Sequence, residues 1–300
     1  MLKIAHIINP VVVNDSSDLF IAQPVTFETM KIAREFAHPG VEVTLFYVQY
    51  PEDHSITPEG FIITEDLNRS ILDFGTFKKR RKLPIVRDIL DRLYESTDAD
   101  YLIYTNVDIA LMPHFYLAVK KLIESGYDAL VINRRTISDK YKSLNDIALM
   151  YADVGKPHAG YDCFIFRRDA YPKYKLGNVC IGASRMGLVL ICNLIAYSKK
   201  FKVFKEEHLT FHIGQERVWQ NDGYMDYTHY NERETIKILK EFDKESDIFS
   251  YNGPLGEFIQ DYQKNRDFTF AKELFAHHKN SSESRNIYAG KILRRLLYRR

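Results

Sequence analysis

Cysteine is scarce in this sequence, and long apolar runs and an excess of charge of one sign are absent. The three cysteines, Cys163, Cys180 and Cys192, show neither C-x-x-C nor zinc-type spacing, which argues against a disulfide framework and a structural zinc site and fits a reducing cytosol. Asn9-Pro10 interrupts the apolar start, and no stretch of about 18 apolar residues occurs, so we expect neither a signal peptide nor a membrane span. With 42 Lys and Arg residues against 40 Asp and Glu residues, no nucleic-acid partner is expected.

Two common phosphate-binding motifs are also missing. Neither G-x-G-x-x-G after the first apolar segment nor G-x-x-x-x-G-K-[ST] is present, which removes sequence support for a dinucleotide site of the usual kind and for a P-loop. A nucleotide-binding protein without these motifs must hold phosphates in another way. A divalent cation bound by a carboxylate at a strand end is one such way, because the metal neutralises a diphosphate.

The sequence does contain a regular alternation of strand-like and helix-like segments. At 300 residues, 45% of them hydrophobic, the chain can build a substantial core. The β-α-β-α-β-α-β order predicts an α/β fold with a mainly parallel sheet and helices on both faces. Ligands of such sheets bind beyond the carboxyl ends of the strands. The segments are 3–9, 27–37, 41–50, 84–96, 101–105, 115–126 and 128–135.

One strand end carries a polar triplet. In DADYLIYTNVDIALMPHFY (98–116), the apolar strand YLIYT runs into Asn106-Val107-Asp108 before a helical pattern begins after Pro113. An ionised carboxylate at that edge is costly unless it is solvated, hydrogen-bonded or bound to a cation. Asp108 is therefore a candidate metal or ribose ligand, and Asn106 a candidate for binding the nucleoside. The structural alternative is that Asp108 caps the next turn and Asn106 is a turn residue.

A histidine pair lies far downstream, in HLTFHIG. His208 and His212 are four residues apart, which on a helix would place both on one face for zinc. Thr210-Phe211 and the following Gly214 favour a strand and a loop instead, in which residues four apart also share a face. His212 is thus a candidate ligand of a donor-bound cation, with a separate zinc site as the alternative.

Asp162 is the candidate catalytic carboxylate. It begins the apolar segment GYDCFIF, and a general base needs a carboxylate within hydrogen-bond reach of the attacking hydroxyl. The structural alternative is a carboxylate paired with Arg167 or Arg168, of which strand alternation favours Arg168. Asp169 and Asp222 are weaker rivals for the same role.

Several basic and aromatic residues are candidates for ligand binding. An arginine fork suits a diphosphate better than the point charge of lysine. The run 78–82 precedes a helix that should begin near Pro84, although by default such a run is a solvated loop. Trp219, Tyr224, Tyr227 and Tyr230 either line an acceptor groove or pack as core and surface residues. The candidate donor-binding arginines are Arg81, Arg87, Arg185 and Arg217.

In their order, these segments resemble GT-A fold glycosyltransferases that use nucleotide-diphospho-sugar donors. YLIYTNVDI resembles the Asp-x-Asp metal loop, although Asn106 stands at its first, usually acidic position and Asp108 at its last. HIGQERVW (212–219) is similar to a His-x-x-Gly…Trp segment of some retaining members, shorter by one residue. AGYDCFIFRRDAYP (159–172) and GNVCIGASRMG (177–187) resemble the acceptor-side strand of bacterial members and the segment that opens the next helix. The resemblance covers about residues 1 to 235.

The resemblance implies a GT-A-like (Rossmann-like) fold and a bacterial-type glycosyltransferase that builds a polysaccharide or glycolipid. The nucleotide-sugar donor would bind near Asn9, with Mn²⁺ or Mg²⁺ on Asp108 and His212 and a glycan or lipid-linked acceptor hydroxyl near Asp162. Inversion and retention both stay open, because the His-Ile-Gly segment favours retention and an Asp162 base favours inversion.

Two rival functions come from other classes. A sugar-1-phosphate nucleotidyltransferase has a similar sheet, but it should carry a Gly-rich, basic loop after the first strand. Residues 9–24, NPVVVNDSSDLFIAQP, contain neither glycine nor Lys or Arg. A non-catalytic binding or scaffold protein is the other rival, supported by the missing first carboxylate at Asn106.

The chain changes character after about residue 235. We expect a glycosyltransferase domain over 1–235 and a helical C-terminal extension over 236–300, beginning with the charged helix 234–247. The basic amphipathic end, 287–300, is suited to an anionic membrane surface. The alternative is docking on its own domain or on a second subunit, as in a homo-oligomer. These features predict a cytoplasmic protein, or one peripheral at the inner face of the membrane.

Overall fold

The computed structural model describes residues 1–158, 160–214 and 222–265. Arg217 and Trp219, candidates for donor binding and packing, lie outside the described residues, as does the basic segment 287–300. No helix within the described ranges is long and apolar enough to cross a membrane.

The core of the molecule is a seven-stranded sheet with the order β10-β6-β9-β4-β1-β2-β3. Neighbouring strands are parallel except at β9, which is antiparallel to both β4 and β6. The mainly parallel sheet predicted from the sequence is confirmed. Its strands are β1 (Lys3–Ile8), β2 (Glu42–Tyr47), β3 (Ile62–Ile63), β4 (Tyr101–Thr105), β6 (Ala129–Ile132), β9 (Cys163–Arg167) and β10 (Phe201–Phe204).

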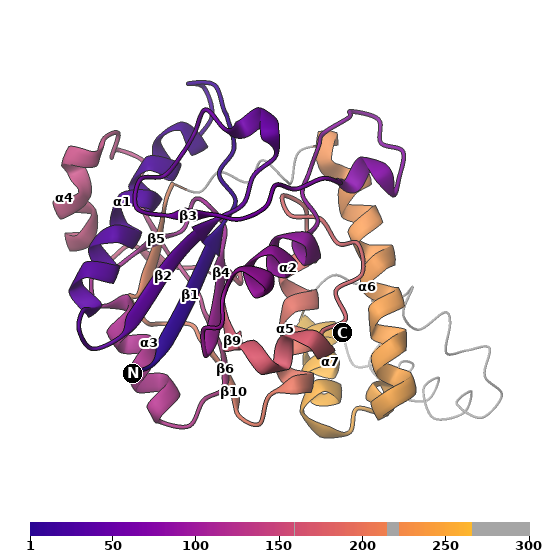
Figure 1. The fold of residues 1–300 in the computed structure, drawn as a ribbon. Coiled ribbons are helices and arrows are strands. Elements are labelled where there is room, and N and C mark those ends of the chain that lie inside the picture. The colour runs from indigo at the N-terminus through magenta and orange to yellow at the C-terminus, as the bar shows by residue number, and fades with distance from the viewer. Residues whose placement is uncertain (159, 215–221, 266–300) are drawn as a thin grey trace, which may run out of the picture. The chain divides into compact units, whose positions relative to one another are not determined.

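Helices cover both faces of this sheet, as predicted (Figure 1). On one face, α1 and α3 pack against β1, where Met30 and Phe115 share a core with Ile4. On the other face, α2 contacts β1 and β4, and α5 contacts β6. The buried residues of α2 recur at positions 86, 89, 90 and 93, the spacing of one helix face. The helices are α1 (Leu19–Ala37), α2 (Val86–Ser96), α3 (Phe115–Glu124) and α5 (Met186–Tyr197).

A second sheet has four strands in the order β5-β11-β7-β8. The segment 128–135, expected to be one strand, is divided between β6 in the main sheet and β7 in the small sheet. Asn133 and Arg134 form the junction. A small apolar core containing Met150 of α4 and Phe211 of β11 supports this sheet. Its elements are β5 (Ala110–Leu111), β7 (Arg135–Ile137), β8 (Lys156–Pro157), β11 (Thr210–Ile213) and α4 (Ile147–Ala152).

The chain divides into two compact units, 1–238 and 239–300, where the sequence places a boundary after residue 235. The helix expected at 234–247 begins nine residues earlier, as α6 (Met225–Ser246), so its first part belongs to the first unit. The second unit contains α7 (Gly253–Asn265) among its described residues. The C-terminal part of the chain is thus helical over α6 and α7.

Candidate functional site

Four polar side chains lie side by side at the carboxyl edge of the main sheet. The antiparallel registers of β9 with β4 and with β6 both end at Cys163. One residue beyond these last pairs, Asp162 lies between Asn106 and Asn133. The parallel register of β1 with β4, extended by two residues, places Asn9 beside Asn106. The edge predicted to bind ligands therefore carries three carboxamides and one carboxylate.

Asp108 and His212 are brought together by the small sheet. The antiparallel pair β5·β11 places Phe211 opposite Ala110. One residue further along, His212 lies opposite Ile109 and therefore next to Asp108. His212 Nε2 lies 3.2 Å from Asp108 Oδ2, and the side chains are 3% and 21% exposed, respectively. The strand expected around His212 is confirmed. The two residues to which the sequence assigns a metal are direct neighbours.

The tautomer of His212 limits what its other nitrogen can do. Its Nδ1 lies 3.0 Å from the carbonyl oxygen of Gly214, and a carbonyl only accepts, so Nδ1 must carry a proton. Nε2 then faces Asp108 either as the second N–H of an imidazolium or with a free lone pair. In the second case two acceptors face each other, and only a shared cation makes that arrangement favourable.

Asp108 is held in its ionised form. Burial alone would raise its pKa, but the hydrogen bond and the charge of His212, together with the charge of Arg134, outweigh burial and lower the pKa of Asp108. A carboxylate held ionised at neutral pH is suited to binding a cation.

Asp162 has the opposite tendency. It is buried, and Arg134 Nη1 donates a hydrogen bond of 3.2 Å to its Oδ1. Burial raises the pKa of Asp162; the charge of Arg134 opposes this effect and the charge of Asp108 adds to it. The partner expected from strand alternation is wrong, because Arg167 and Arg168 bond other groups. A carboxyl group with a raised pKa is suited to exchanging a proton.

Several buried polar atoms of this region have no hydrogen-bond partner among the described residues. They are Oδ1 of Asp108, Oδ2 of Asp162, Oδ1 of Asn133 and Nε of Arg134. Buried polar groups are normally paired, and each exception calls for an explanation such as a bound ligand, ion or water. Four exceptions among neighbouring residues at a sheet edge indicate a place where a polar ligand binds.

The chemistry of these donors fits a divalent cation that is shared with a ligand. Two groups that occupy adjacent positions on an octahedral ion, with bonds of about 2.1 Å, lie about 3 Å apart, close to the observed Nε2–Oδ2 distance. Among the described residues, no group of three or more His, Cys, Asp or Glu side chains could hold a metal alone. The pair therefore fits Mg²⁺ or Mn²⁺ completed by phosphate oxygens and water, and it gives no support to a separate zinc site.

Asn106 and Asn9 are fixed by hydrogen bonds at the sheet edge. The hydroxyl of Tyr104 donates to Asn106 Oδ1 at 2.9 Å, two residues before the Asp108 carboxylate. Asn9 is buried, and its Nδ2 donates to the carbonyl oxygen of Val48 at 2.7 Å. Asn106 is thus oriented by a residue of β4, the strand that precedes it, and Asn9 by the residue that follows β2.

The candidate arginines lie in other surroundings. The guanidinium of Arg81 lies over the ring of Tyr224, 4.1 Å from its centroid. Arg185 forms an ion pair with Glu232 at 2.8 Å, and both side chains are nearly buried. Neither arginine is among the groups whose charge acts most strongly on Asp108.

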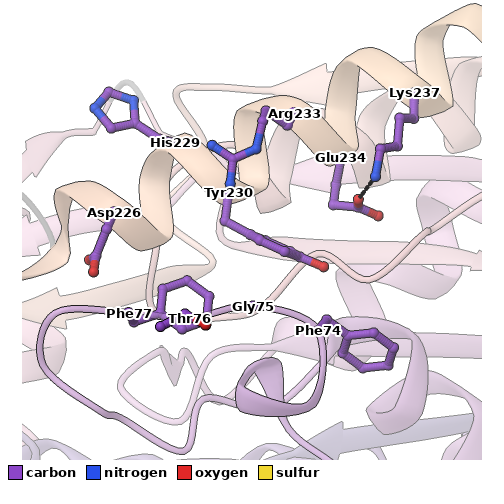
Figure 2. Close-up of a pocket in the computed structure, with 10 residues that line it drawn as sticks. All are labelled: Phe74, Gly75, Thr76, Phe77, Asp226, His229, Tyr230, Arg233, Glu234 and Lys237. Carbon is purple, nitrogen blue, oxygen red and sulfur yellow. Dashed lines mark hydrogen bonds and ion pairs between the residues drawn. The ribbon is translucent and has the colours of Figure 1, made fainter.

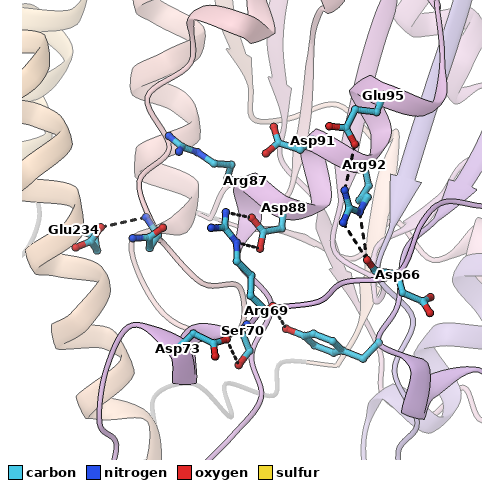
Figure 3. A network of polar contacts seen from close by, with 12 residues as sticks. Asp66, Arg69, Ser70, Asp73, Arg87, Asp88, Asp91, Arg92, Glu95 and Glu234 are labelled. Atoms are coloured by element: carbon cyan, nitrogen blue, oxygen red, sulfur yellow. Dashed lines mark hydrogen bonds and ion pairs between the residues drawn. The ribbon is translucent and has the colours of Figure 1, made fainter.

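Arg87 belongs to a polar network that joins α2 to the loop before it (Figure 3). Arg69 binds the carboxylate of Asp88 through two hydrogen bonds of 2.8 and 2.6 Å. The charge of Arg87 acts on Asp91, one turn further along the same helix. In this structure Arg87 therefore lies among the contacts that position the start of α2.

Arg134 and Asn133 are the site residues that sequence analysis did not identify. They lie in VINRR (131–135), and the signal that marks Asn106 and Asp108, polar residues directly after a buried strand, was available for them as well. The expected strand 128–135 concealed the signal, because it placed both residues inside a strand.

No protein-family model matches this sequence, and no curated protein matches it. Solved structures similar to this chain include residues 1–349 of S. aureus TarS in complex with UDP-GlcNAc, with a TM-score of 0.47, 7% identity, and coverage of 85% of this chain and 77% of that one. The same protein in complex with UDP gives a TM-score of 0.44 at 8% identity, covering 86% and 78%. The structure itself shows the mainly parallel, helix-covered sheet expected from the sequence.

Proposed function

We propose that this chain is a glycosyltransferase that moves a sugar from a nucleotide-sugar donor to a hydroxyl group of a glycan or glycolipid acceptor. The observation that carries the proposal is the pair of carboxylates at the carboxyl edge of the sheet. His212 and Arg134 lower the pKa of Asp108, burial raises the pKa of Asp162, and each has a buried oxygen without a partner among the described residues. Two carboxyl groups in one site whose surroundings shift their pKa values in opposite directions are typical of sites in which one carboxylate stays ionised and the other exchanges a proton.

On the donor side, Asp108 Oδ2 and His212 Nε2 would hold Mn²⁺ or Mg²⁺. Such an ion, when bound, neutralises the charge that develops on a departing nucleoside diphosphate. Arg134 adds a positive charge next to both carboxylates, and its unpartnered Nε offers a donor to a phosphate oxygen. Asn106, fixed by Tyr104, orients a ligand at the same edge.

On the acceptor side, Asp162 takes the proton from the attacking hydroxyl. Arg134 binds its Oδ1, so the unpartnered Oδ2 is the oxygen left to accept that proton. The raised pKa of Asp162 makes it a stronger base than a solvated carboxylate once it is ionised. A base in this position favours an inverting transfer.

The main rival is a binding protein that uses the same edge without turnover. Both functions predict that a nucleotide sugar stabilises the fold, but only a transferase releases a nucleoside diphosphate. The nucleotidyltransferase alternative is weaker because the loop after β1 lacks glycine, lysine and arginine over residues 9–24.

Thermal unfolding with UDP-, GDP-, CMP- and dTDP-sugars, with and without Mn²⁺, tests the donor side. A ligand at a hundred times its dissociation constant stabilises by about 2.7 kcal/mol. We expect one nucleotide class to raise the melting temperature only with Mn²⁺, and Asp108→Ala to abolish the rise. Asp98→Ala is the matched control, because that side chain is 88% exposed. The absence of a shift with every sugar at millimolar concentration would contradict the proposal.

Product analysis then separates the rivals. The stabilising nucleotide sugar is incubated with glycan and glycolipid acceptors, and release of its nucleotide is followed: a nucleoside diphosphate, or CMP if the donor is a CMP-sugar. Stabilisation without release on any acceptor would favour the binding protein.

A further inference from the structure

A run of five basic residues, 78–82, lies at the same edge of the main sheet as the candidate site. It belongs to the segment 64–85, which follows β3 and precedes α2. Because β3 and β4 are parallel to their neighbours and α2 returns the chain to the start of β4, this segment begins and ends at the carboxyl edge (Figure 1). The side chains of Lys78, Lys79 and Arg80 are exposed, and none of them pairs with a carboxylate of the described residues.

The backbone of this run is held in place by α6. Directly before it, the loop 74–77 lies against α6 (Figure 2), and the ring of Phe77 stacks on that of Tyr227 with the centroids 4.1 Å apart. The backbone N–H of Lys78 donates to Asp226 Oδ2 at 2.7 Å, and the hydroxyl of Tyr227 donates to the carbonyl oxygen of Lys79 at 2.6 Å. A partner that binds the exposed basic side chains would therefore not have to order the loop that carries them.

Few negative charges oppose the basic run. Among the described residues, two carboxylates bond to it: Asp226 through the backbone of Lys78, and Glu52, which accepts a hydrogen bond of 2.5 Å from Lys82 Nζ. The chain as a whole is close to neutral, with 42 basic and 40 acidic residues, so this charge is a local feature. Five basic residues against two carboxylates leave the run positively charged, which favours an anionic partner.

Exposed apolar side chains lie along the same edge. Glu52 is followed by Asp53, whose Oδ1 accepts a hydrogen bond of 2.8 Å from the backbone N–H of Val12, in the loop after β1. Val12 is 45% exposed. Phe20, in the first turn of α1, is 49% exposed, and this turn lies at the carboxyl edge because α1 follows β1. Large apolar side chains that gather at one exposed edge indicate an interaction site.

An apolar groove of about 550 Å³ adjoins these side chains. Val13 and Phe20 line it together with Ile56 and Leu144, and Leu144 is itself 46% exposed. Lys142 is the only charged side chain among the described residues that line the groove, and it is exposed. The edge thus combines exposed apolar side chains with positive charge, and the described lining of the groove contains no carboxylate.

We propose that the carboxyl edge of the molecule binds an anionic lipid bilayer, with the basic run against the lipid phosphates and the exposed Val12, Phe20 and Leu144 among the headgroups. Basic side chains are attracted to an anionic surface and apolar side chains gain from burial in it, and two such signals bind stably where one binds only weakly. Bound in this way, the molecule turns the candidate site toward the membrane. The inference goes beyond the proposed function, and it concerns a different part of the chain from the basic segment 287–300.

NBD, a fluorophore that responds to the polarity of its surroundings, tests the orientation in the whole chain. The three natural cysteines are buried, so a maleimide reacts with a cysteine introduced at an exposed position. With vesicles of phosphatidylglycerol and phosphatidylcholine, the NBD emission of Phe20→Cys should rise and shift to shorter wavelength, whereas vesicles of phosphatidylcholine alone should leave it unchanged. Phe36→Cys is the matched control, because Phe36 is 56% exposed and lies in the last turn of the same helix, at the opposite edge. Its emission should not change.

Sedimentation with the same vesicles tests the basic run. The unmodified chain should bind the anionic vesicles less tightly as salt is raised, and a neutral triple variant of the run should bind them at least about tenfold more weakly. This variant is Lys78→Gln/Lys79→Gln/Arg80→Gln. The matched control removes three exposed lysines near the start of β10, at the amino edge of the sheet, and should bind as the unmodified chain does. The control is Lys199→Gln/Lys200→Gln/Lys202→Gln.

The absence of binding to anionic vesicles, an equal response of the labels at positions 20 and 36, or an equal loss of binding in the two triple variants would each overturn the inference. Binding that is unchanged in the variant at 78–80 but lost when Arg294, Arg295 and Arg299 become glutamine would place the contact in the segment 287–300, and it would overturn the inference as well. Both experiments contain no donor and no acceptor, so their outcome is independent of whether the chain transfers a sugar.

Discussion

Replacement of Asp162 by asparagine should stop transfer while leaving donor binding intact. Asparagine has nearly the same shape and keeps an oxygen that can accept the 3.2 Å hydrogen bond from Arg134, but it cannot take up a proton. General-base catalysis contributes about 10²- to 10⁴-fold, so the barrier should rise by about 3–5 kcal/mol.

The effect on folding should be smaller than the effect on turnover. Arg134 keeps its hydrogen bond but loses a charged partner in a pair whose side chains are 11% and 8% exposed. A loss of about 1–3 kcal/mol in the free energy of unfolding is expected. Urea unfolding measures this loss, and it separates a folding defect from a catalytic one.

Release of the nucleoside diphosphate gives the rate, and the Mn²⁺-dependent thermal shift gives donor binding in the same preparation. Asp169→Asn is the control, because Asp169 is the rival carboxylate from the sequence and its side chain is 65% exposed. Turnover of Asp162→Asn within tenfold of the unmodified chain would refute the role of Asp162 as the base. If Asp169→Asn lost its transfer rate instead, Asp169 and not Asp162 would be the general base.

Three further outcomes test other parts of the structure. Because the pKa of Asp108 is lowered in the folded state, its stabilising contribution is present above its unfolded pKa of about 3.9 and is lost as pH falls through the folded value. The free energies of unfolding in urea of the unmodified chain and of Asp108→Asn should therefore converge below about pH 4. A difference between them that does not change with pH would contradict the lowered pKa. Gly155→Ala should lower the free energy of unfolding by at least about 2 kcal/mol, since φ is +58° and a Cβ would lie 2.5 Å from the Thr136 carbonyl oxygen; an unchanged urea midpoint would refute this. Asn231→Ala should lower the free energy of unfolding by about 2–4 kcal/mol, because the buried Asn231 side chain hydrogen-bonds both the N–H and the C=O of Cys180, at 3.0 and 2.9 Å. A loss below about 1 kcal/mol would show that water replaces these bonds.

The end of β4 and the helices α2 and α3 could be predicted because their signals are local, whereas α1 begins at Leu19, eight residues before its predicted start at 27. The segment YLIYT is apolar throughout, and the polar triplet after it marks the point where burial ends, so β4 and Asp108 were correctly placed. The apolar face of α2 repeats at helical spacing within eleven residues. Such patterns depend on neighbours along the chain, which a single sequence contains.

The partner of Asp162 could not be predicted in this way. Side-chain alternation along one strand offers only Arg168 as a partner on the same face as Asp162. The actual partner, Arg134, follows β6, the strand that pairs with β9. The end of β6 was itself misplaced, because β7 pairs with β11, about 75 residues further along the chain. Pairing across that separation leaves no local pattern, so the junction at Arg134 looked like the continuation of a strand.

Arg134 connects the two halves of the candidate site. Its charge helps to lower the pKa of Asp108 and opposes the effect of burial on the pKa of Asp162. Without it, the effect of burial on the pKa of Asp162 would lose its largest opposing charge, and Asp108 would depend mainly on His212 for its lowered pKa. The charge of His212 also acts on both carboxyl groups, but only Asp108 has a hydrogen bond with His212, and Asp162 is repelled by the charge of Asp108. The difference between the two carboxyl groups therefore arises from the hydrogen bond between Asp108 and His212 and from the like charge that Asp162 meets, and it supports the proposed division of roles, with cation binding on Asp108 and proton exchange on Asp162.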